Sequence, residues 1–470
     1  MNKQRAKRIY ITDLLEKPGS EVEIFGWVNS RRDHGKIIFF DLRDSTGLLQ
    51  TVITPKQEKA YKIAEGLTSE DCIKVKGELK NRPEGNINPD LATGKVELTA
   101  TEIEIIGKAK ELPLPIDTDG LEIDETVRLK YRYIDLRRER LQKNLKVRHE
   151  VVTHIRNFLN QEKFIEIETP YMSKTTPEGA RDFLVPSRLQ KGEFYALTQS
   201  PQQYKQLLML TGVDRYYQFP RAFRDEDLRA DRQFEHTQLD LEMAFVDRED
   251  ILGLIEELMT SLAEKLGKKI TTKPFPRYTF AEALKKFGAD KFDNRKNKDD
   301  KNELAFAFVI DFPLFEYNEE EKRWTFSHNP FTSPDPDDIE NLKVEKDIGK
   351  IGSLQYDLVC NGFELASGSI RIHEPEIQKQ VFKIMGYSQK QIEEDFGHIL
   401  EAYSYGAPVH GGIAVGLDRL VAVIQGEKSI REVIAFPIAS SGQIAVMDAP
   451  SEVSEKTLKE LGIKLNKEKE

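Results

Sequence analysis

Alternating apolar and polar residues mark the chain from Glu21 to about Ile106, in short runs separated by glycine, asparagine and proline. Runs such as VEIFGWV (22–28) and CIKVKGEL (72–79) have the period of two that is typical of half-buried strands. Several short strands at this spacing predict a small barrel over residues 1–106. Residues 107–140 are rich in proline and charge, which favours a linker to the next domain.

Longer elements are predicted beyond residue 140. Apolar residues recur every three or four positions from Leu141 to Leu159, which predicts an amphipathic helix to about Gln161. A strand, FIEIETPYM (164–172), is expected next. From 216 to 245, two alternating apolar ends enclose the charged stretch RDEDLRADRQ (224–233), which predicts a long antiparallel hairpin. This combination of a helix, a strand and an antiparallel hairpin favours an α+β domain over residues 141–470.

The charged stretch of this hairpin has two interpretations. It could be a solvated charge run, although exposed ion pairs contribute only about 0–1 kcal/mol each. Alternatively it belongs to a binding site, because Asp240 lies between Leu239 and Leu241 within the second strand, which places a carboxylate on one face. A cationic loop above such a carboxylate suits a ligand that carries both phosphate and ammonium groups.

Two later segments also carry candidate chemistry. Asp357 and Glu364 lie seven residues apart on flanking strand positions, and paired carboxylates suit Mg²⁺ that bridges phosphate oxygens, although one pair is a weak signal. GAPVHGGIAVGLDRL (406–420) runs from small residues into Arg419, so the backbone can approach a nucleotide while the arginine meets its phosphates. It lacks the GxxxxGK[ST] pattern, which excludes a P-loop enzyme.

Composition narrows the class of protein. With 470 residues, 32% of them charged and 39% hydrophobic, the chain is expected to form two or three soluble domains. No run approaches the ~18 apolar residues of a membrane helix and the N-terminus lacks a secretory apolar region, so we expect no membrane partner and a cytoplasmic location. The two cysteines signal neither a disulfide framework nor a zinc site. A net charge of −10 argues against indiscriminate nucleic-acid binding but leaves room for local basic patches.

FRDEDLRADRQ (223–233) followed by TQLDLE (237–242) resembles the second signature motif of class II aminoacyl-tRNA synthetases, in the bacterial-type aspartyl form. The helix and strand that close on Pro170, the segment QSPQQYKQLLML (199–210) and the GLDR of 416–419 resemble further segments of that family, so the similarity covers nearly all the chain. It implies an N-terminal five-stranded OB-fold barrel that binds the anticodon. It also implies a catalytic domain built on an antiparallel sheet flanked by helices, and a two-fold homodimer.

The resemblance implies that ATP and L-aspartate form an aspartyl-adenylate, with Mg²⁺ as cofactor, and that tRNA receives the aspartyl group. Such a reaction needs positioning and charge neutralisation rather than a protein base. The catalytic positions are Arg224 and Arg419, and the metal ligands are Asp357 and Glu364. The aspartate-binding positions are Glu178, Gln202, Lys205, Arg224, Asp240, His328 and Arg371. The ATP-binding positions are Arg224, Glu226, Gln233, His236, Glu364, Gly416, Leu417, Asp418 and Arg419. Lys205 and Arg371, the latter bidentate, are expected to clamp the side-chain carboxylate, so that asparagine would leave a buried positive charge uncompensated.

On the barrel, alternation alone leaves open whether Phe39 or Phe40 belongs to the core. The resemblance implies that Phe39 stacks on an anticodon base and that Gln50 reads a base edge. His34 and Gly85 match the members that charge both aspartate and asparagine tRNAs, which would imply an amidotransferase partner. The alternatives are that both are ordinary turn residues and that the enzyme charges aspartate tRNA only. The positions expected to select tRNA are Arg32, His34, Phe39, Gln50 and Gly85.

The chain departs from the family pattern in two places. Only 32 residues separate Pro276 from Val309, so an inserted domain is truncated near 277–303, where the polar run DNRKNKDDKNE (293–303) predicts a flexible loop. His236 stands where the family commonly has an adenine-stacking phenylalanine, and Phe234 precedes it by two residues, so the stacking residue stays open.

Two other classes of protein are worth weighing. One is a tRNA-binding paralogue without catalysis, although the catalytic arginines and the carboxylate pair are all present. The other is an ATP-dependent asparagine-forming enzyme on the same fold, which would not need the anticodon-binding barrel.

Overall fold

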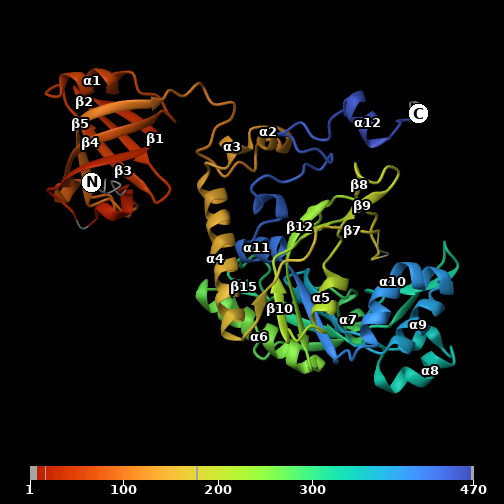
Figure 1. The fold of residues 1–470 in the computed structure, drawn as a ribbon. Helices are drawn as coiled ribbons and strands as arrows, with labels where there is room; N and C mark the ends of the chain where they lie inside the picture. The colour runs from red at the N-terminus through yellow and green to blue at the C-terminus, as the bar shows by residue number, and fades with distance from the viewer. Residues whose placement is uncertain (1–7, 16, 176–177, 467–470) are drawn as a thin grey trace, which may run out of the picture. The chain divides into compact units, whose positions relative to one another are not determined.

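A computed structural model describes residues 8–15, 17–175 and 178–466, and the chain divides into two compact units, residues 1–113 and 114–470 (Figure 1). The boundary falls inside the expected linker, and residues 114–140 belong to the second unit, where they form two short helices.

The first unit is a closed five-stranded barrel with strand order β1-β2-β3-β5-β4, which confirms the predicted OB-fold architecture. Its elements are β1 (Glu21–His34), β2 (Ile37–Arg43), β3 (Leu48–Ile53), α1 (Glu58–Glu65), β4 (Cys72–Asn81) and β5 (Val96–Gly107). Alternate strand residues fill the interior, and Phe40 is the phenylalanine of β2 that lies in this core. Phe39 therefore points outward, where the Arg32 guanidinium lies 5.8 Å from its ring centroid.

The second unit is built on a nine-stranded sheet whose central strands are antiparallel and whose edge pairings, β6 with β10 and β14 with β16, are parallel. Along the sheet the order is β14-β16-β19-β20-β21-β12-β10-β6, and β11 pairs with β12. The strands are β6 (Ile165–Glu166), β10 (Arg215–Gln218), β11 (Arg221–Phe223), β12 (Glu235–Ala244), β14 (Arg277–Thr279), β16 (Phe306–Ile310), β19 (Gln355–Cys360), β20 (Phe363–Ile370) and β21 (His410–Gly416). The small sheets contain β7 (Met172–Ser173), β8 (Leu184–Pro186) and β9 (Phe194–Leu197), β13 (Lys269–Ile270) with β15 (Glu303–Leu304), and β17 (Phe315–Asn318) with β18 (Arg323–Phe326).

The predicted hairpin is confirmed: β12 pairs antiparallel with β10 and β11. Its first arm is interrupted before β11 at Pro220, which has no backbone N–H to donate. The expected helix is confirmed as α4 (Glu139–Gln161), whereas the expected strand over 164–172 is reduced to the short edge strand β6 and to β7. The helices of this unit are α2 (Glu125–Lys130), α3 (Arg132–Asp135), α4, α5 (Gln202–Leu208), α6 (Arg248–Lys265), α7 (Phe280–Phe287), α8 (Ile339–Lys343), α9 (Pro375–Ile384), α10 (Gln389–Tyr403), α11 (Leu417–Gln425) and α12 (Glu455–Leu461). None of the helices in the described ranges is long and apolar enough to span a bilayer.

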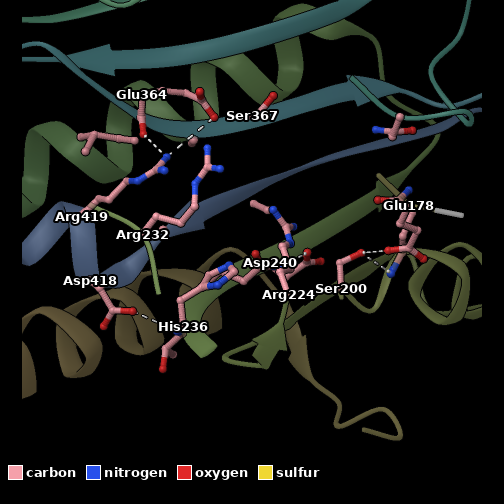
Figure 2. A pocket seen from close by; sticks show the side chains of 18 of the residues that line it. Glu178, Ser200, Arg224, Arg232, His236, Asp240, Glu364, Ser367, Asp418 and Arg419 are labelled. Carbon is pink, nitrogen blue, oxygen red and sulfur yellow. Dashed lines mark hydrogen bonds and ion pairs between the residues drawn. The ribbon is translucent and has the colours of Figure 1, made fainter. Parts of the chain in front are cut away.

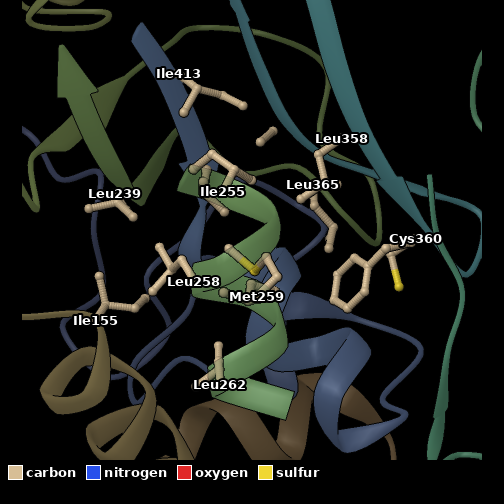
Figure 3. Packing of buried hydrophobic residues seen from close by; sticks show 14 of the residues in the cluster. Ile155, Leu239, Ile255, Leu258, Met259, Leu262, Leu358, Cys360, Leu365 and Ile413 are labelled. Atoms are coloured by element: carbon tan, nitrogen blue, oxygen red, sulfur yellow. The ribbon is translucent and has the colours of Figure 1, made fainter. Parts of the chain in front are cut away.

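The main core lies between the sheet and helices α4, α6 and α11 (Figure 3). On β12, Leu239, Leu241 and Met243 point into this core because successive strand side chains alternate between faces. Ile155 from α4 and Leu258 from α6 belong to the same cluster. The side chains between them on β12 point to the opposite face of the sheet.

A buried carboxylate holds residues 114–140 in the second unit. Asp135 is fully buried and accepts hydrogen bonds from Arg128, Arg132 and Arg138, at 2.6 Å from Arg138 Nε. Although burial alone would raise the pKa of Asp135, its bonds to Arg128 and Arg138 lower it. Arg128 also pairs with Glu432 at 2.7 Å, so this cluster joins α2 and α3 to the chain that follows α11.

We expect the substitution Asp135→Asn to lower the free energy of unfolding by about 3–5 kcal/mol, because it leaves buried arginines without their counter-charge. The lowered pKa means that the carboxylate stabilises the fold above its unfolded value of about 4 and loses this effect as the pH falls through the folded value. Thermal unfolding at pH 7 and pH 3 measures both effects, with the exposed Asp299→Asn as the matched control. Equal stability of the two variants at pH 7 would contradict the assignment.

Candidate active site

A cavity of about 300 Å³ opens on the face of the sheet opposite the main core (Figure 2). It brings together residues from α5, β12, β20, β21 and the loop 224–233, which are far apart in sequence. The predicted residues that line it are Glu178, Gln202, Lys205, Arg224, Glu226, Gln233, His236, Asp240, His328, Glu364, Arg371, Gly416, Asp418 and Arg419. Leu417 lies in the hydrophobic core instead, and Asp357 lies behind Ser367, whose hydroxyl donates to it at 2.5 Å.

The floor of the cavity is a buried network of four charges. The Lys205 ammonium lies 2.9 Å from Asp240 Oδ1 and 3.2 Å from Glu242 Oε2. Arg371 donates from Nε to Glu242 Oε1 at 2.9 Å and from Nη2 to Oε2 at 3.2 Å. All four side chains are almost completely buried, so two cations are balanced by two carboxylates.

This pairing limits how Lys205 and Arg371 could clamp a substrate carboxylate. The bidentate fork of Arg371 is already occupied by Glu242, and its Nη1 donates to Ser369 Oγ at 2.7 Å. Only part of the guanidinium edge is left for a ligand. Burial would raise the pKa of Glu242, but Arg371 and Lys205 lower it to about 2, so this carboxylate is ionised. Burial raises the pKa of Asp240.

Glu242 needs a glycine beside it. A Cβ atom on Gly412 would lie 2.1 Å from Glu242 Oε2, so the small residue on β21 makes room for the carboxylate. A Cβ on Gly411 would meet Ile370 and Ile251 side chains. These two glycines therefore serve internal packing, and of the expected glycine-rich strand it is Ala414 and Gly416 that line the cavity.

The other end of the cavity is rich in arginine. Arg419 Nη1 donates to the Glu364 carbonyl at 3.0 Å, and its Nη2 lies 3.4 Å from Asp231. Arg224 Nε donates to the carbonyl of Gln199 at 3.3 Å. Arg232 pairs with Glu226 at 3.1 Å across the charged loop. The loop is thus fixed by specific contacts rather than being a solvated charge run.

Asp357 and Glu364 are close enough for their charges to interact, and Glu364 Oε1 lies 3.9 Å from Arg419 Nη1. Burial and the nearby charge of Glu364 raise the pKa of Asp357 well above its ordinary value. Asp357 also accepts a hydrogen bond from Ser367 Oγ. No group of three or more histidine, cysteine or acidic residues within the described ranges could hold a metal by itself. The pair fits a divalent cation that takes its remaining ligands from water or a phosphate, because such an ion would relieve the repulsion between the two carboxylates.

Two histidines line the cavity as neutral imidazoles. Burial and the charges of Arg224 and Arg419 lower the pKa of His236 to about 3. Burial together with Arg371 and Lys205 lowers the pKa of His328 to about 3 as well. His236 faces the cavity, whereas Phe234 packs edge-on against Phe183, with ring centroids 5.5 Å apart.

Several expected ligand positions are engaged with the protein itself. The side-chain amide of Gln233 makes two hydrogen bonds of 3.2 Å with the backbone of Ile438. Asp418 accepts from Arg148 at 2.6 Å and from the backbone N–H of Thr237 at 3.0 Å. These contacts hold both side chains in place in the wall of the cavity.

The loop that begins at Glu178 contributes to the lining of the cavity. Ser200 Oγ donates to Glu178 at 2.7 Å. The buried side chain of Gln199 bonds both backbone groups of Ala180, at 3.0 and 2.8 Å, and donates to Asp182 at 2.6 Å. Because the carbonyl of Gln199 also accepts from Arg224, one residue links this loop to the arginine end.

On the barrel, Arg32 donates to Gln50 at 2.7 Å, and Gln50 donates to Glu97 at 2.9 Å. Together with Phe39 these residues form one polar and aromatic surface. His34 ends β1 and Gly85 lies in a short turn, both exposed, and nothing lies within 4 Å of a Cβ built on Gly85. The fold of the barrel therefore does not require a glycine there.

Some functional candidates escaped prediction from sequence. Glu242 could have been found, because it shares a strand face with Asp240 two residues earlier. Glu97, Gln199 and Ser367 had no such signal, since their importance depends on partners far away in sequence.

Residues 124–440 match the family described as tRNA synthetases class II (D, K and N), and residues 22–106 match an OB-fold nucleic acid binding domain. An aspartate–tRNA(Asp/Asn) ligase of Dehalococcoides mccartyi (strain CBDB1) is 40% identical, with 97% of this chain and 98% of that protein covered. The enzyme of the same name from Thermodesulfovibrio yellowstonii is 41% identical, covering 96% and 98%. The alignment with the Dehalococcoides protein spans 590 positions against the 470 residues here.

Among solved structures, asparaginyl-tRNA synthetase from Pyrococcus horikoshii complexed with asparaginyl-adenylate matches with a TM-score of 0.74 at 22% identity, covering 92% of this chain and 98% of that one. At this identity the match supports the fold alone. The two family matches and the relatives above 30% identity establish more: this chain belongs to the class II tRNA synthetases and is an aminoacyl-tRNA synthetase with an OB-fold domain at its N-terminal end.

Proposed function

We propose that this synthetase joins L-aspartate to tRNA in two steps, through an aspartyl-adenylate formed from ATP. The observation that carries the proposal is one cavity with two different ends, a charge-balanced floor around Lys205 and Arg371 and an arginine-rich end around Arg224 and Arg419. The names of the two bacterial relatives, aspartate–tRNA(Asp/Asn) ligases, support the same substrate.

At the floor, the side-chain carboxylate of aspartate accepts hydrogen bonds from Lys205 and from the unused edge of Arg371. Asparagine is a poorer ligand because its amide offers one acceptor and one donor, and neither cation has an acceptor for that donor. Selection therefore depends on the direction of hydrogen bonds rather than on an unpaired positive charge. The substrate ammonium lies near Asp240 and Glu178. Gln202 and His328 complete this part of the site.

At the other end, Arg224 contacts the α-phosphate and the reacting carboxylate, and Arg419 holds the γ-phosphate. A carboxylate oxygen of aspartate attacks the α-phosphorus while the bond to the bridging oxygen of the β-phosphate breaks, and pyrophosphate leaves with that electron pair. The arginines neutralise the charge that develops. Asp357 and Glu364 would hold Mg²⁺, which would shield the phosphate charge.

The nucleoside lies along the wall formed by the charged loop and β21. His236 stacks on the adenine, since a neutral imidazole has a flat aromatic face. Glu226 accepts from the adenine amino group. Gln233, Glu364, Gly416 and Asp418 shape this wall, the first through its contact with the backbone of Ile438, and Leu417 supports the wall from the hydrophobic core.

The barrel binds the anticodon, with Phe39 stacking on a base and Arg32, Gln50 and neighbouring groups reading base edges. The two bacterial relatives are named for both aspartate and asparagine tRNAs, and the exposed His34 and Gly85 fit the same relaxed selection. A relaxed enzyme works with an amidotransferase that converts aspartyl-tRNA(Asn). The enzyme is a cytoplasmic homodimer, assembled through α4 and the short strand β6.

Purified enzyme is expected to charge both aspartate tRNA and asparagine tRNA with labelled aspartate, because the exposed His34 and Gly85 fit relaxed selection and the two relatives are named for both tRNAs. Charging of aspartate tRNA alone would identify a discriminating enzyme. Absence of charging together with absence of ATP–pyrophosphate exchange would contradict the synthetase reaction and point to a tRNA-binding paralogue.

Substitution of Gly85 by lysine and of His34 by alanine is expected to reduce kcat/KM for asparagine tRNA at least tenfold more than for aspartate tRNA, since one altered base contact is worth roughly 1–3 kcal/mol. Aminoacylation of the two tRNAs measures the ratio. The control is ATP–pyrophosphate exchange without tRNA, which both variants should retain. An equal loss for the two tRNAs would show that these positions do not discriminate.

The variant His236→Ala is expected to raise KM for ATP about tenfold, because stacking on a base contributes roughly 1–3 kcal/mol. His236→Phe should retain or improve wild-type KM, as a larger aromatic face is present. ATP–pyrophosphate exchange measures both, with KM for aspartate as the internal control. If His236→Ala leaves KM for ATP unchanged, adenine stacks elsewhere.

A further inference from the structure

The shortened insertion contributes a well-anchored segment to the active site. Helix α7 ends at Gly288, which adopts a left-handed conformation (φ +77°) and turns the chain toward Phe292. The Phe292 ring is buried and stacks on Phe287 with centroids 3.8 Å apart. Its carbonyl accepts a hydrogen bond of 2.9 Å from the N–H of Gly362, in the turn between β19 and β20. The backbone just before Phe292 is therefore fixed beside the strands that carry Asp357 and Glu364.

Lys291 projects from this anchored segment and lines the cavity. Its ammonium has no hydrogen bond or ion pair with any residue of the described ranges, in contrast to most cations of the cavity. Lys205 and Arg371 share Glu242, Arg232 pairs with Glu226, and Arg419 lies near Asp231. A cation without a counter-charge at the edge of a binding cavity is available for an anionic ligand.

The anchor of this segment shows which end of the cavity it approaches. The carbonyl of Phe292 accepts from Gly362, which precedes Glu364 by two residues, and Arg419 donates to the Glu364 carbonyl at 3.0 Å. Lys291, the residue before Phe292, thus belongs to the arginine-rich end rather than to the floor around Lys205.

We propose that Lys291 binds the β- and γ-phosphates of ATP and holds the pyrophosphate that leaves when the adenylate forms. A lysine ammonium acts as a compact, adaptable point charge on phosphate, and its flexible stem can follow the leaving group. The proposal rests on the adenylate-forming function proposed above. A phosphate of the tRNA acceptor end is the competing ligand for the same charge, and it belongs to the second step only.

The test is ATP–pyrophosphate exchange without tRNA, measured for Lys291→Gln, Lys291→Arg and the matched control Lys296→Gln, which alters an exposed lysine of the same segment outside the cavity lining. In Lys291→Gln, KM for ATP and for pyrophosphate should rise about tenfold, because a charge-assisted hydrogen bond is lost. KM for aspartate should stay unchanged, Lys291→Arg should recover part of the loss, and Lys296→Gln should match the wild type.

Exchange in Lys291→Gln that equals the wild type would overturn the proposal, as would a defect confined to KM for tRNA in aminoacylation. A general loss of folding is recognised by a lower Tm and a raised KM for aspartate, and would also count against a direct phosphate contact. If the wild-type enzyme itself shows no exchange, the function proposed above fails, which is a different result from failure of the Lys291 assignment alone.

Discussion

Four buried charges at the floor of the cavity constrain the catalytic unit. Asp240 and Glu242 on β12 balance Lys205 on α5 and Arg371, which follows β20. Removal of one member of such a set typically costs about 3–5 kcal/mol, because a buried charge is left unpaired. The network therefore fixes the helix, the central strand and the end of β20 in one arrangement, and Gly412 must remain without a side chain for Glu242 to fit.

Pairing of the cations changes how the floor can distinguish ligands. Two unpaired cations would favour any anion, whereas a balanced network presents a fixed pattern of donors and acceptors. A group that matches that pattern binds without moving the buried charges, and a group that reverses one hydrogen bond leaves a polar atom unsatisfied, at a cost of about 1–3 kcal/mol. Rigidity is thus part of selection, since a floor that could rearrange would accept the reversed group.

From the sequence, the face of a strand on which a side chain lies was easier to predict than the residue that the side chain contacts. Alternation on β12 separates Leu239 and Leu241, which enter the core, from Asp240, which enters the cavity, and this could be foreseen. Glu242 and Arg371 are 129 residues apart in the sequence, and Gln233 and Ile438 are 205 residues apart. No periodic pattern could therefore reveal the hydrogen bonds between them. The strand expected over 164–172 is split into β6 and β7 because the segment passes from the large sheet to a small one, with Pro170, which has no N–H to donate, between them.

The two ends of the cavity differ in how their charges are held, and this matches the two tasks proposed for them. Charges at the floor are buried and mutually paired, so they cannot follow a moving ligand. At the other end Arg419 is only partly buried, its nearest carboxylate contacts are 3.4 and 3.9 Å, and Lys291 has no ion pair within the described residues. Long cationic side chains that are not locked in short ion pairs can shift with phosphates whose positions change during the reaction. In the function proposed here, the fixed floor would select the amino acid, while the more adaptable end would accommodate a polyphosphate before and after its bond breaks.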